Sequence, residues 1–334
     1  MKLSTKAYIV VALVVAIVLA PIAIYSLQTP TSETFGSSIT KTHNVGPHER
    51  ISITDASDFT TPGTGSGCEC VTAGSGSSSD PFVISDWKLS ASEGNGISIA
   101  STSVYFIIRN IMVNATEMHD SVVLRNVANG TIQESYISGG GISLYNSNEI
   151  SIINNTITGS RFGVLLEGSN NNTISGNRLD HIQQVGIFVR ASNNLIAGNH
   201  LTSGYFGGIN IDGLTGSGSG NRVENNVVEG NAQYGIGLWQ ARNNLVRANV
   251  VSMNGGAGIM LAASCSNNQV EQNSVVKNNA DGILVDEQSA ENKISGNTAT
   301  GNGDGANSFD LHDEGSDNVW LSNTFNTKKP DAIR

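Results

Sequence analysis

The chain has 334 residues, with 18 lysine and arginine residues against 28 aspartate and glutamate residues, for a formal net charge of -10. This acidic balance argues against nucleic acid and anionic lipid surfaces as partners, because both repel a negatively charged protein. The 38 glycines, with many asparagines and serines, are typical of turn-rich β structure rather than of packed helices.

The first 27 residues combine positive charge with apolar character. Lys2 and Lys6 precede an almost unbroken apolar run from residue 7 to residue 27. About 20 apolar residues suffice to span a bilayer, and lysines ahead of the span predict a cytoplasmic N-terminus. A cleaved signal peptide is the alternative, although Pro21 and Tyr25 stand where a cleavage site is expected. We favour a membrane anchor, and both interpretations place the remaining chain outside the cytoplasm, at the cell surface or secreted.

Residues 28–79 are rich in serine, threonine and glycine, which predicts a stalk and an N-terminal cap with one short strand at residues 51–53. Cys68 and Cys70 lie in the glycine/serine stretch of this segment. With His43 and His48 upstream they are candidate copper ligands, because copper(I) prefers sulfur. The alternative is that the two cysteines are oxidised together or paired between chains.

Residues 80–326 repeat one pattern, seen most plainly in FGVLLEGSNNNTISGNRL at residues 162–179. A glycine and two apolar residues are followed by a polar turn, another apolar residue, an asparagine and a final apolar residue. The asparagine recurs every 22 to 27 residues, at Asn155, Asn177, Asn199, Asn226, Asn249, Asn273, Asn297 and Asn323. We start this series at Asn110, with Ser135 replacing asparagine one repeat later. The remaining residues, 327–334, form a short polar tail.

A repeat of this length is one supersecondary unit that cannot bury its apolar face alone. Each unit holds three short alternating runs, and alternation with period two indicates strands. Three strands per turn, stacked in parallel, predict an all-β solenoid, a parallel β-helix of about ten turns. The asparagine is expected at a tight corner in the left-handed conformation, with its amide bonded to the next turn. Cys265 takes the position of Ser147 and Ser169, which predicts a small stacked residue.

The repeat resembles the right-handed parallel β-helix of the pectate-lyase-like superfamily, and more closely its NosD-like branch with carbohydrate-binding and sugar-hydrolase (CASH) repeats. SDPFVISDWKL at residues 79–89 and FDLHDEGSDNVWLSNTF at residues 309–325 resemble the first and last turns of that family. The resemblance implies that the ladder lies between the second and third strands, and that the sheet of first strands lines the binding cleft. It also implies three functional classes, namely glycan binding or adhesion, polysaccharide cleavage, and copper-enzyme maturation.

Alternation along the first strands predicts which side chains point outward. One outer row reads Ala100, Arg125, Tyr145, Glu167, Arg190, Asp212, Trp239, Ala262, Asp286 and His312. The row before it includes Phe188, Asn210, Leu284 and Asp310, and the adjacent loops carry His181, Tyr205 and Tyr234. An exposed tyrosine or tryptophan offers a flat surface to a sugar ring, and carboxylates and arginines bind its hydroxyls. We therefore predict a polysaccharide or cell-surface glycan as the partner, bound by Tyr145, Phe188, Asn210, Trp239, Tyr205, Tyr234 and His181.

Glu167, Arg190 and Asp212 are candidate catalytic residues of a polysaccharide lyase or glycoside hydrolase. Two strand spacings separate the carboxylates by about 9–10 Å, near the upper end of the separation in inverting glycosidases. The alternative is a surface ion-pair row that keeps the sheet soluble. The acidic last turn around His312 is a candidate calcium site. The exposed strands at the ends of the coil could pair with another copy of the chain, so a homo-oligomer is possible.

Overall fold

The computed structural model describes residues 46–59, 68–116, 118–303, 306–330 and 333. Among these residues, no helix has the length and apolar character needed to cross a membrane. The predicted anchor at residues 1–27 lies outside the described residues, as does His43.

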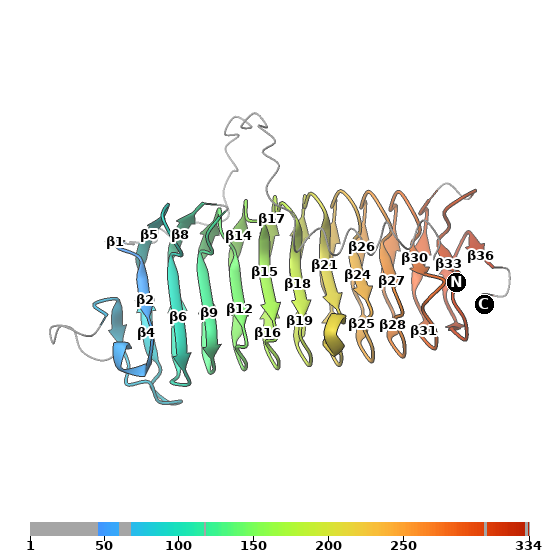
Figure 1. Cartoon of the computed structure of the whole chain (residues 1–334). Helices are drawn as coiled ribbons and strands as arrows, with labels where there is room; N and C mark the ends of the chain where they lie inside the picture. Colours follow the sequence, from blue (N-terminus) through green and yellow to red (C-terminus); the bar gives the residue numbers. More distant parts are fainter. Residues whose placement is uncertain (1–45, 60–67, 117, 304–305, 331–332, 334) are drawn as a thin grey trace, which may run out of the picture. The chain divides into compact units, whose positions relative to one another are not determined.

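The described chain coils through three sheets of twelve strands each, which stack turn upon turn (Figure 1). The first-strand sheet contains β2 (Ile51–Ile53), β6 (Ile97–Thr102), β9 (Val122–Val127), β12 (Ile142–Tyr145), β15 (Phe162–Glu167), β18 (Val185–Arg190), β21 (Gly207–Asp212), β24 (Ile236–Trp239), β27 (Ile259–Ala262), β30 (Ile283–Val285), β33 (Leu311–Asp313) and β36 (Lys328–Lys329). The second-strand sheet contains β3 (Val71–Ala73), β4 (Phe82–Ser85), β7 (Phe106–Arg109), β10 (Gly130–Gln133), β13 (Ser151–Ile153), β16 (Thr173–Ser175), β19 (Leu195–Ala197), β22 (Arg222–Glu224), β25 (Leu245–Arg247), β28 (Gln269–Glu271), β31 (Lys293–Ser295) and β34 (Val319–Leu321). The third-strand sheet contains β1 (Gly46–His48), β5 (Trp87–Ala91), β8 (Met112–Ala115), β11 (Tyr136–Ser138), β14 (Thr156–Thr158), β17 (Arg178–Asp180), β20 (His200–Thr202), β23 (Val227–Glu229), β26 (Val250–Ser252), β29 (Ser274–Val276), β32 (Thr298–Thr300) and β35 (Thr324–Phe325).

Strand pairing is parallel throughout the described chain except at one end, where β3 pairs with β4 in the antiparallel sense. Two short 3-10 helices accompany the strands, η1 (Ala56–Phe59) near the first turn and η2 (Leu214–Gly216) after β21. The predicted parallel β-helix is confirmed, including the strand at residues 51–53. Strands β1 and β2 pair with β5 and β6, so the coil begins within the segment predicted as a stalk and cap.

The core is a stack of aliphatic side chains from alternate strand positions. Ile187 and Val189 of β18 pair with Ile209 and Ile211 of β21, and all four side chains are fully buried. Because each turn places its inward residues over those of the turn before, like side chains pack on like along the solenoid. This packing explains the regular isoleucine, valine and leucine positions of the repeat.

The predicted asparagine ladder between the second and third strands is confirmed. Asn226 shows its geometry: its backbone N–H and its Nδ2 donate to Oδ1 of Asn249, at 2.9 and 3.0 Å. Nδ2 also donates to the backbone oxygen of Ile196 at 2.9 Å, and Oδ1 accepts the same pair of bonds from Asn199. Every polar atom of this buried amide therefore has a partner.

Two further ladders line the other corners of the coil, and sequence reasoning missed both. The corner between first and second strands carries Asn172, Asn194, Asn221, Asn244, Asn268, Asn292 and Asn318, each bonded to the next. The corner between third and first strands carries Asn231, Asn254, Asn278 and Asn302, and ends on Asp310. The signal was present in the chain, because these asparagines lie five residues before or after members of the predicted ladder.

The ladder residues are not in the left-handed conformation, and this expectation was wrong. The left-handed residue is the one before each, as at Asn154 (φ 54°), Asn225 (φ 55°) and Ala248 (φ 53°). This preceding residue makes the turn, and the side chain of the ladder asparagine that follows it is directed inward and buried. Asn110 (φ 50°) belongs to the same left-handed series, so Ile111, whose N–H bonds to Ser135, occupies the ladder position there.

Cys265 lies in the predicted stack of small residues and is fully buried. Its backbone N–H donates to Ser289 Oγ at 3.0 Å, and five turns earlier in the coil that of Ser147 donates to Ser169 Oγ in the same way. Burial raises the pKa of the Cys265 thiol to about 12.

We expect Cys265 to resist alkylation by iodoacetamide at pH 8, because only the thiolate reacts and burial suppresses both its formation and access to it. Mass spectrometry of protein alkylated in the native state and in guanidinium chloride checks this. Modification should appear only in denaturant, and rapid modification of the native protein would contradict the stacked, buried position.

Candidate functional site

The predicted outer row of the first-strand sheet is present over its central turns. Tyr145 pairs with Glu167, Glu167 with Arg190, and Asp212 with Trp239. The last turn departs from the prediction, since His312 pairs with Leu284 and therefore lies in the neighbouring row. Asp310 precedes the strand and ends the third ladder instead of pointing outward. The extra residues between β32 and β33 shift the register, and the repeat pattern could not show this.

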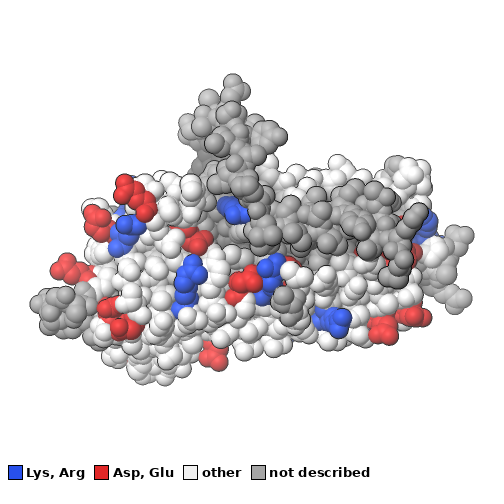
Figure 2. Space-filling view, in the orientation of Figure 1, with Lys and Arg blue, Asp and Glu red and all other residues white. Residues whose placement is uncertain are grey.

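Arg190 joins Glu167 and Asp212 into an ion-pair row. Its Nη2 lies 2.7 Å from Oδ2 of Asp212, and its Nη1 lies 3.4 Å from Oε2 of Glu167. The Asp212 side chain is 2 % exposed, and its second oxygen accepts a 2.8 Å bond from the backbone N–H of Leu214. Both Asp212 oxygens are thus engaged by the protein. These contacts form an ion-pair row, as in the alternative, but Asp212 is buried rather than at the surface. Figure 2 shows acidic and basic side chains neighbouring one another on this face.

The expectation of an exposed Trp239 ring was wrong, since the residue is 5 % exposed. Its ring lies over Gly237, where an added Cβ would approach within 1.9 Å, and packs edge-on against Tyr234 at 4.7 Å between ring centroids. The Tyr234 ring covers Gly207 in the same way and receives a 3.3 Å bond from Asn210. Aromatic rings fill the spaces left by two glycines, so Tyr234 and Trp239 are packing residues here.

The remaining predicted ligand-binding residues divide by exposure. Phe188 and Asn210 are buried in the outer face of the sheet, with the Phe188 ring 5.6 Å from that of Phe162. Tyr205 and His181 are exposed in the loops between third and first strands, and His181 Nδ1 lies 3.0 Å from Asp180. The structure therefore does not gather the seven residues into one cleft.

A hollow of about 320 Å³ lies where β9, β12 and β15 begin, and we call it the Asp120 hollow. Asp120 Oδ1 accepts a 2.7 Å bond from Ser143, and the Arg125 guanidinium stacks 4.1 Å above the ring of Tyr145. Its lining is Asn95, Met118, His119, Asp120, Arg125, Gly140, Gly141, Ser143, Tyr145, Arg161, Phe162 and Leu165. Of the residues predicted from sequence as ligand-binding, only Tyr145 lies here. Asp120 and Ser143 come from different turns, so no local sequence pattern predicted their contact.

Burial perturbs two acids of this hollow. It raises the pKa of the Asp120 carboxyl, against the lowering effects of the Ser143 hydrogen bond and the charge of Arg125. It also raises the pKa of the Tyr145 phenol, and the neighbouring Asp120 charge adds to that effect. Perturbed acids in a hollow are typical of functional sites, although structural networks produce them too.

Asp120→Asn is expected to stabilise the protein at pH 7. A carboxyl whose pKa is raised in the folded state stabilises the fold at a pH below its unfolded pKa of 3.8. This contribution is lost as the pH rises through the pKa of the folded state. Asparagine can still accept the Ser143 bond but does not titrate. Urea unfolding from pH 3 to pH 8 should show a stability difference that grows with pH, and a variant weaker than wild type at pH 7 would contradict the assignment.

Cys68 and Cys70 form a disulfide, so neither is a free thiolate for copper here. His48 instead packs against Trp87, at 4.6 Å between ring centroids. Within the described ranges, no group of three or more histidine, cysteine, aspartate or glutamate side chains is placed to hold a metal ion. In the acidic last turn, Asp310 and Asp313 bond to ladder asparagines. Copper or calcium binding stays a prediction.

The fold and this face define a class of protein, a right-handed parallel β-helix with a polar first-strand sheet. The chain belongs to the family described as right handed beta helix region, whose model matches residues 71–216 and 211–325. The comparison with curated proteins finds no match.

Solved structures of similar fold are only distantly related in sequence. The Azotobacter vinelandii mannuronan C-5 epimerase AlgE6 A-module has a TM-score of 0.58 at 11% identity, covering 85% of this chain and 88% of its own. A double mutant of the periplasmic alginate epimerase AlgG has a TM-score of 0.53 at 16% identity, covering 72% of each chain. The Dettilon tailspike protein has a TM-score of 0.53 at 17% identity, covering 64% of this chain and 57% of its own. At these identities the likeness shows the fold.

Proposed function

We propose that the first-strand sheet binds a saccharide outside the cytoplasm, with the Asp120 hollow as its principal subsite. The observation that carries this is the convergence of hydrogen-bonding and apolar side chains in one hollow. Asp120, Ser143 and Arg125 offer directional bonds to hydroxyl groups, while Phe162 and Leu165 offer apolar contact to a ring face. The structural neighbours whose names refer to alginate or mannuronan support the choice of ligand class.

Two features support the extracytoplasmic placement. The apolar run at residues 7–27 predicts a membrane anchor or a signal peptide. The disulfide between Cys68 and Cys70 is of a kind that persists in oxidising compartments. We therefore propose a protein that presents its first-strand sheet at the cell surface or in a secreted form.

A polysaccharide and glycan-array screen of the full chain tests the binding proposal. We expect Tyr145→Ala to weaken saccharide binding at least about tenfold, the scale of one lost charge-assisted or stacking contact. Tyr136→Ala is the matched control, because Tyr136 of β11 lies in the turn just before that of Tyr145 but on the third-strand sheet. Equal binding by wild type and both variants would reject the Asp120 hollow as the subsite, and absence of binding to every glycan would reject the function.

A second candidate function is polysaccharide cleavage, by a lyase or hydrolase mechanism. The observation that favours it is the pair of perturbed acids, Asp120 and Tyr145, in one hollow. Asp212 fits a reacting role less well, because the protein occupies both of its oxygens. Product analysis by mass spectrometry decides between the two functions. Turnover that disappears in Asp120→Asn while binding persists supports cleavage, and turnover that is unchanged in that variant places the chemistry elsewhere.

A further inference from the structure

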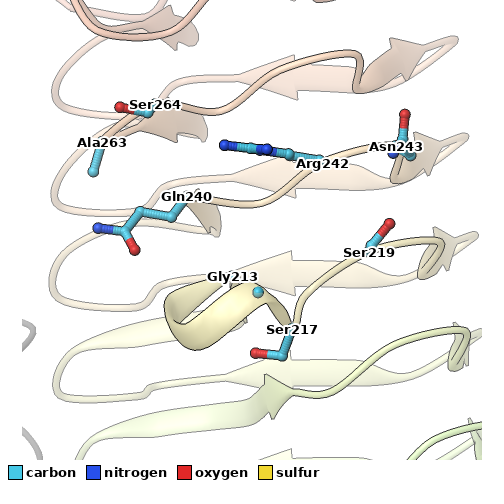
Figure 3. Close-up of a pocket in the computed structure, with 9 residues that line it drawn as sticks. Gly213, Ser217, Ser219, Gln240, Arg242, Asn243, Ala263 and Ser264 are labelled. Carbon is cyan, nitrogen blue, oxygen red and sulfur yellow. The ribbon is translucent and has the colours of Figure 1, made fainter.

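A second hollow, of about 490 Å³, opens at the corner where first strands pass into second strands. We call it the Arg242 hollow. Figure 3 shows it across three successive turns, with the η2 loop on one side and the two following turns beyond it. Its lining is Gly213, Gly216, Ser217, Ser219, Gln240, Arg242, Asn243, Ala263 and Ser264.

The loop that forms one wall is held in place by the protein itself. Leu214 N–H bonds to Asp212, and Ser217 Oγ donates to the backbone oxygens of Asp212 and Leu214, at 3.2 and 2.8 Å. Gly213 packs directly on the next turn, since an added Cβ would lie 2.0 Å from the backbone oxygen of Gln240. The wall is therefore formed before any ligand arrives, which lowers the entropic cost of binding.

The lining carries one charge. Arg242 is the single ionisable side chain among the nine residues, and the others are small or carry neutral hydroxyl and amide groups. In Figure 3 its guanidinium extends along the turn toward the side where Gln240 and Ser264 lie.

Other arginines of the molecule have partners that Arg242 lacks. Arg190, Arg222 and Arg247 each pair with a carboxylate, and Arg125 stacks on a tyrosine. Within the described residues, no carboxylate lies within ion-pair distance of the Arg242 guanidinium. In a protein of net charge -10, Arg242 is thus an exposed positive charge beside a preformed polar hollow, and a guanidinium offers several hydrogen-bond donors to an oxyanion.

We propose that the Arg242 hollow binds the anionic group of an acidic saccharide, a carboxylate or a sulfate ester. Arg242 presents its planar fork of donors to the oxyanion, and Gln240, Asn243 and Ser264 bond neighbouring hydroxyls. This rests on the proposed function, and it extends the binding surface. Four strand spacings, or about 19 Å, separate β12 beside the Asp120 hollow from β24 beside the Arg242 hollow. A saccharide chain crossing the sheet obliquely contacts both.

Calorimetric titration of the full chain tests the proposal with three probes, a uronate oligosaccharide, a neutral oligosaccharide of equal length, and sodium sulfate. We expect Arg242→Gln to weaken binding of the uronate about tenfold to a hundredfold, the worth of one hydrogen-bonded charge pair, and to reduce its salt dependence. Binding of the neutral oligosaccharide should not change. Arg247→Gln is the matched control, because Arg247 lies on the second-strand sheet and pairs with Glu271. A sulfated oligosaccharide in parallel distinguishes the two anionic groups.

The outcomes separate this inference from the proposed function. Uronate binding that Tyr145→Ala weakens and Arg242→Gln leaves unchanged overturns the Arg242 site and keeps the saccharide function. Sulfate binding that Arg242→Gln abolishes, without binding of any saccharide, keeps an anion site and overturns both its saccharide assignment and the proposed function. Equal weakening of neutral and acidic ligands by Arg242→Gln also overturns the inference, because charge would then play no part.

Discussion

Arg190→Met is expected to lower the free energy of unfolding by about 3–5 kcal/mol. Asp212 is 2 % exposed and Arg190 12 % exposed, so the substitution leaves a carboxylate buried without its counter-charge. The loss of one partner from a buried pair has a cost of this size, whereas an exposed pair contributes about 0–1 kcal/mol. Methionine keeps the length of the arginine stem, which limits the loss of packing. Denaturant unfolding followed by circular dichroism measures the effect.

Arg247→Met is the control for this experiment. Arg247 faces Glu271 across 3.6 Å at the surface, with side chains that are 48% and 23% exposed, and we expect a change below about 1 kcal/mol. The double variant Arg190→Met/Asp212→Asn should recover part of the loss, because no buried charge remains unpaired. If Arg190→Met and Arg247→Met cost the same small amount, the Arg190–Asp212 pair behaves as solvated and Asp212 regains a place among the candidate reacting groups.

Asn226→Ala is expected to destabilise the protein by about 3 kcal/mol. The substitution removes the acceptor of two bonds from Asn199 and the donor to Ile196, all in buried surroundings. Each buried group left without a partner costs about 1–3 kcal/mol. Because a solenoid is stabilised by contacts between neighbouring turns, the loss should weaken the coupling of the turns on either side of Asn226. Thermal and urea unfolding measure the loss.

Asn323→Ala supplies the matched comparison at the last position of the same ladder. There the side chain is partly exposed, so water can replace the bonds it loses to Ile294 and Asn297. We expect a cost near 1 kcal/mol. Hydrogen exchange of the backbone amides should be faster than in wild type in the turns around each substitution. The increase should be larger for Asn226→Ala than for Asn323→Ala. Equal costs at both positions would mean that the ladder bonds contribute no more inside the coil than at its end.

The Arg190→Met experiment also bears on function, because the Arg190–Asp212 pair lies on the candidate binding surface. The Arg190–Asp212 pair occupies the middle of the first-strand sheet and also anchors the η2 loop through Leu214. A variant that frees this pair therefore alters one wall of the Arg242 hollow as well as the sheet. Tyr145 and Arg242 lie outside the pair, so substitutions of these two residues test ligand binding without breaking that pair.

Sequence alone determined the coil, the three strands per turn and the ladder from Asn155 to Asn323. It did so because a period of 22 to 27 residues, with alternating apolar positions inside it, admits few other ways to bury the apolar face. The outer row from Tyr145 to Trp239 followed from the same alternation, and pairing across the strands bears out its order.

Tertiary structure alone decided what those outward residues do. Trp239 is buried because its ring lies in the space above Gly237 and packs against the ring of Tyr234. The repeat pattern does not encode this packing. Asp120 meets Ser143 across 23 positions of chain, since the contact arises where one turn lies on the next. A repeat pattern fixes the backbone path and the direction of each side chain, but the hollows depend on side-chain volume and on contacts between turns. Those quantities exist only once the turns are stacked.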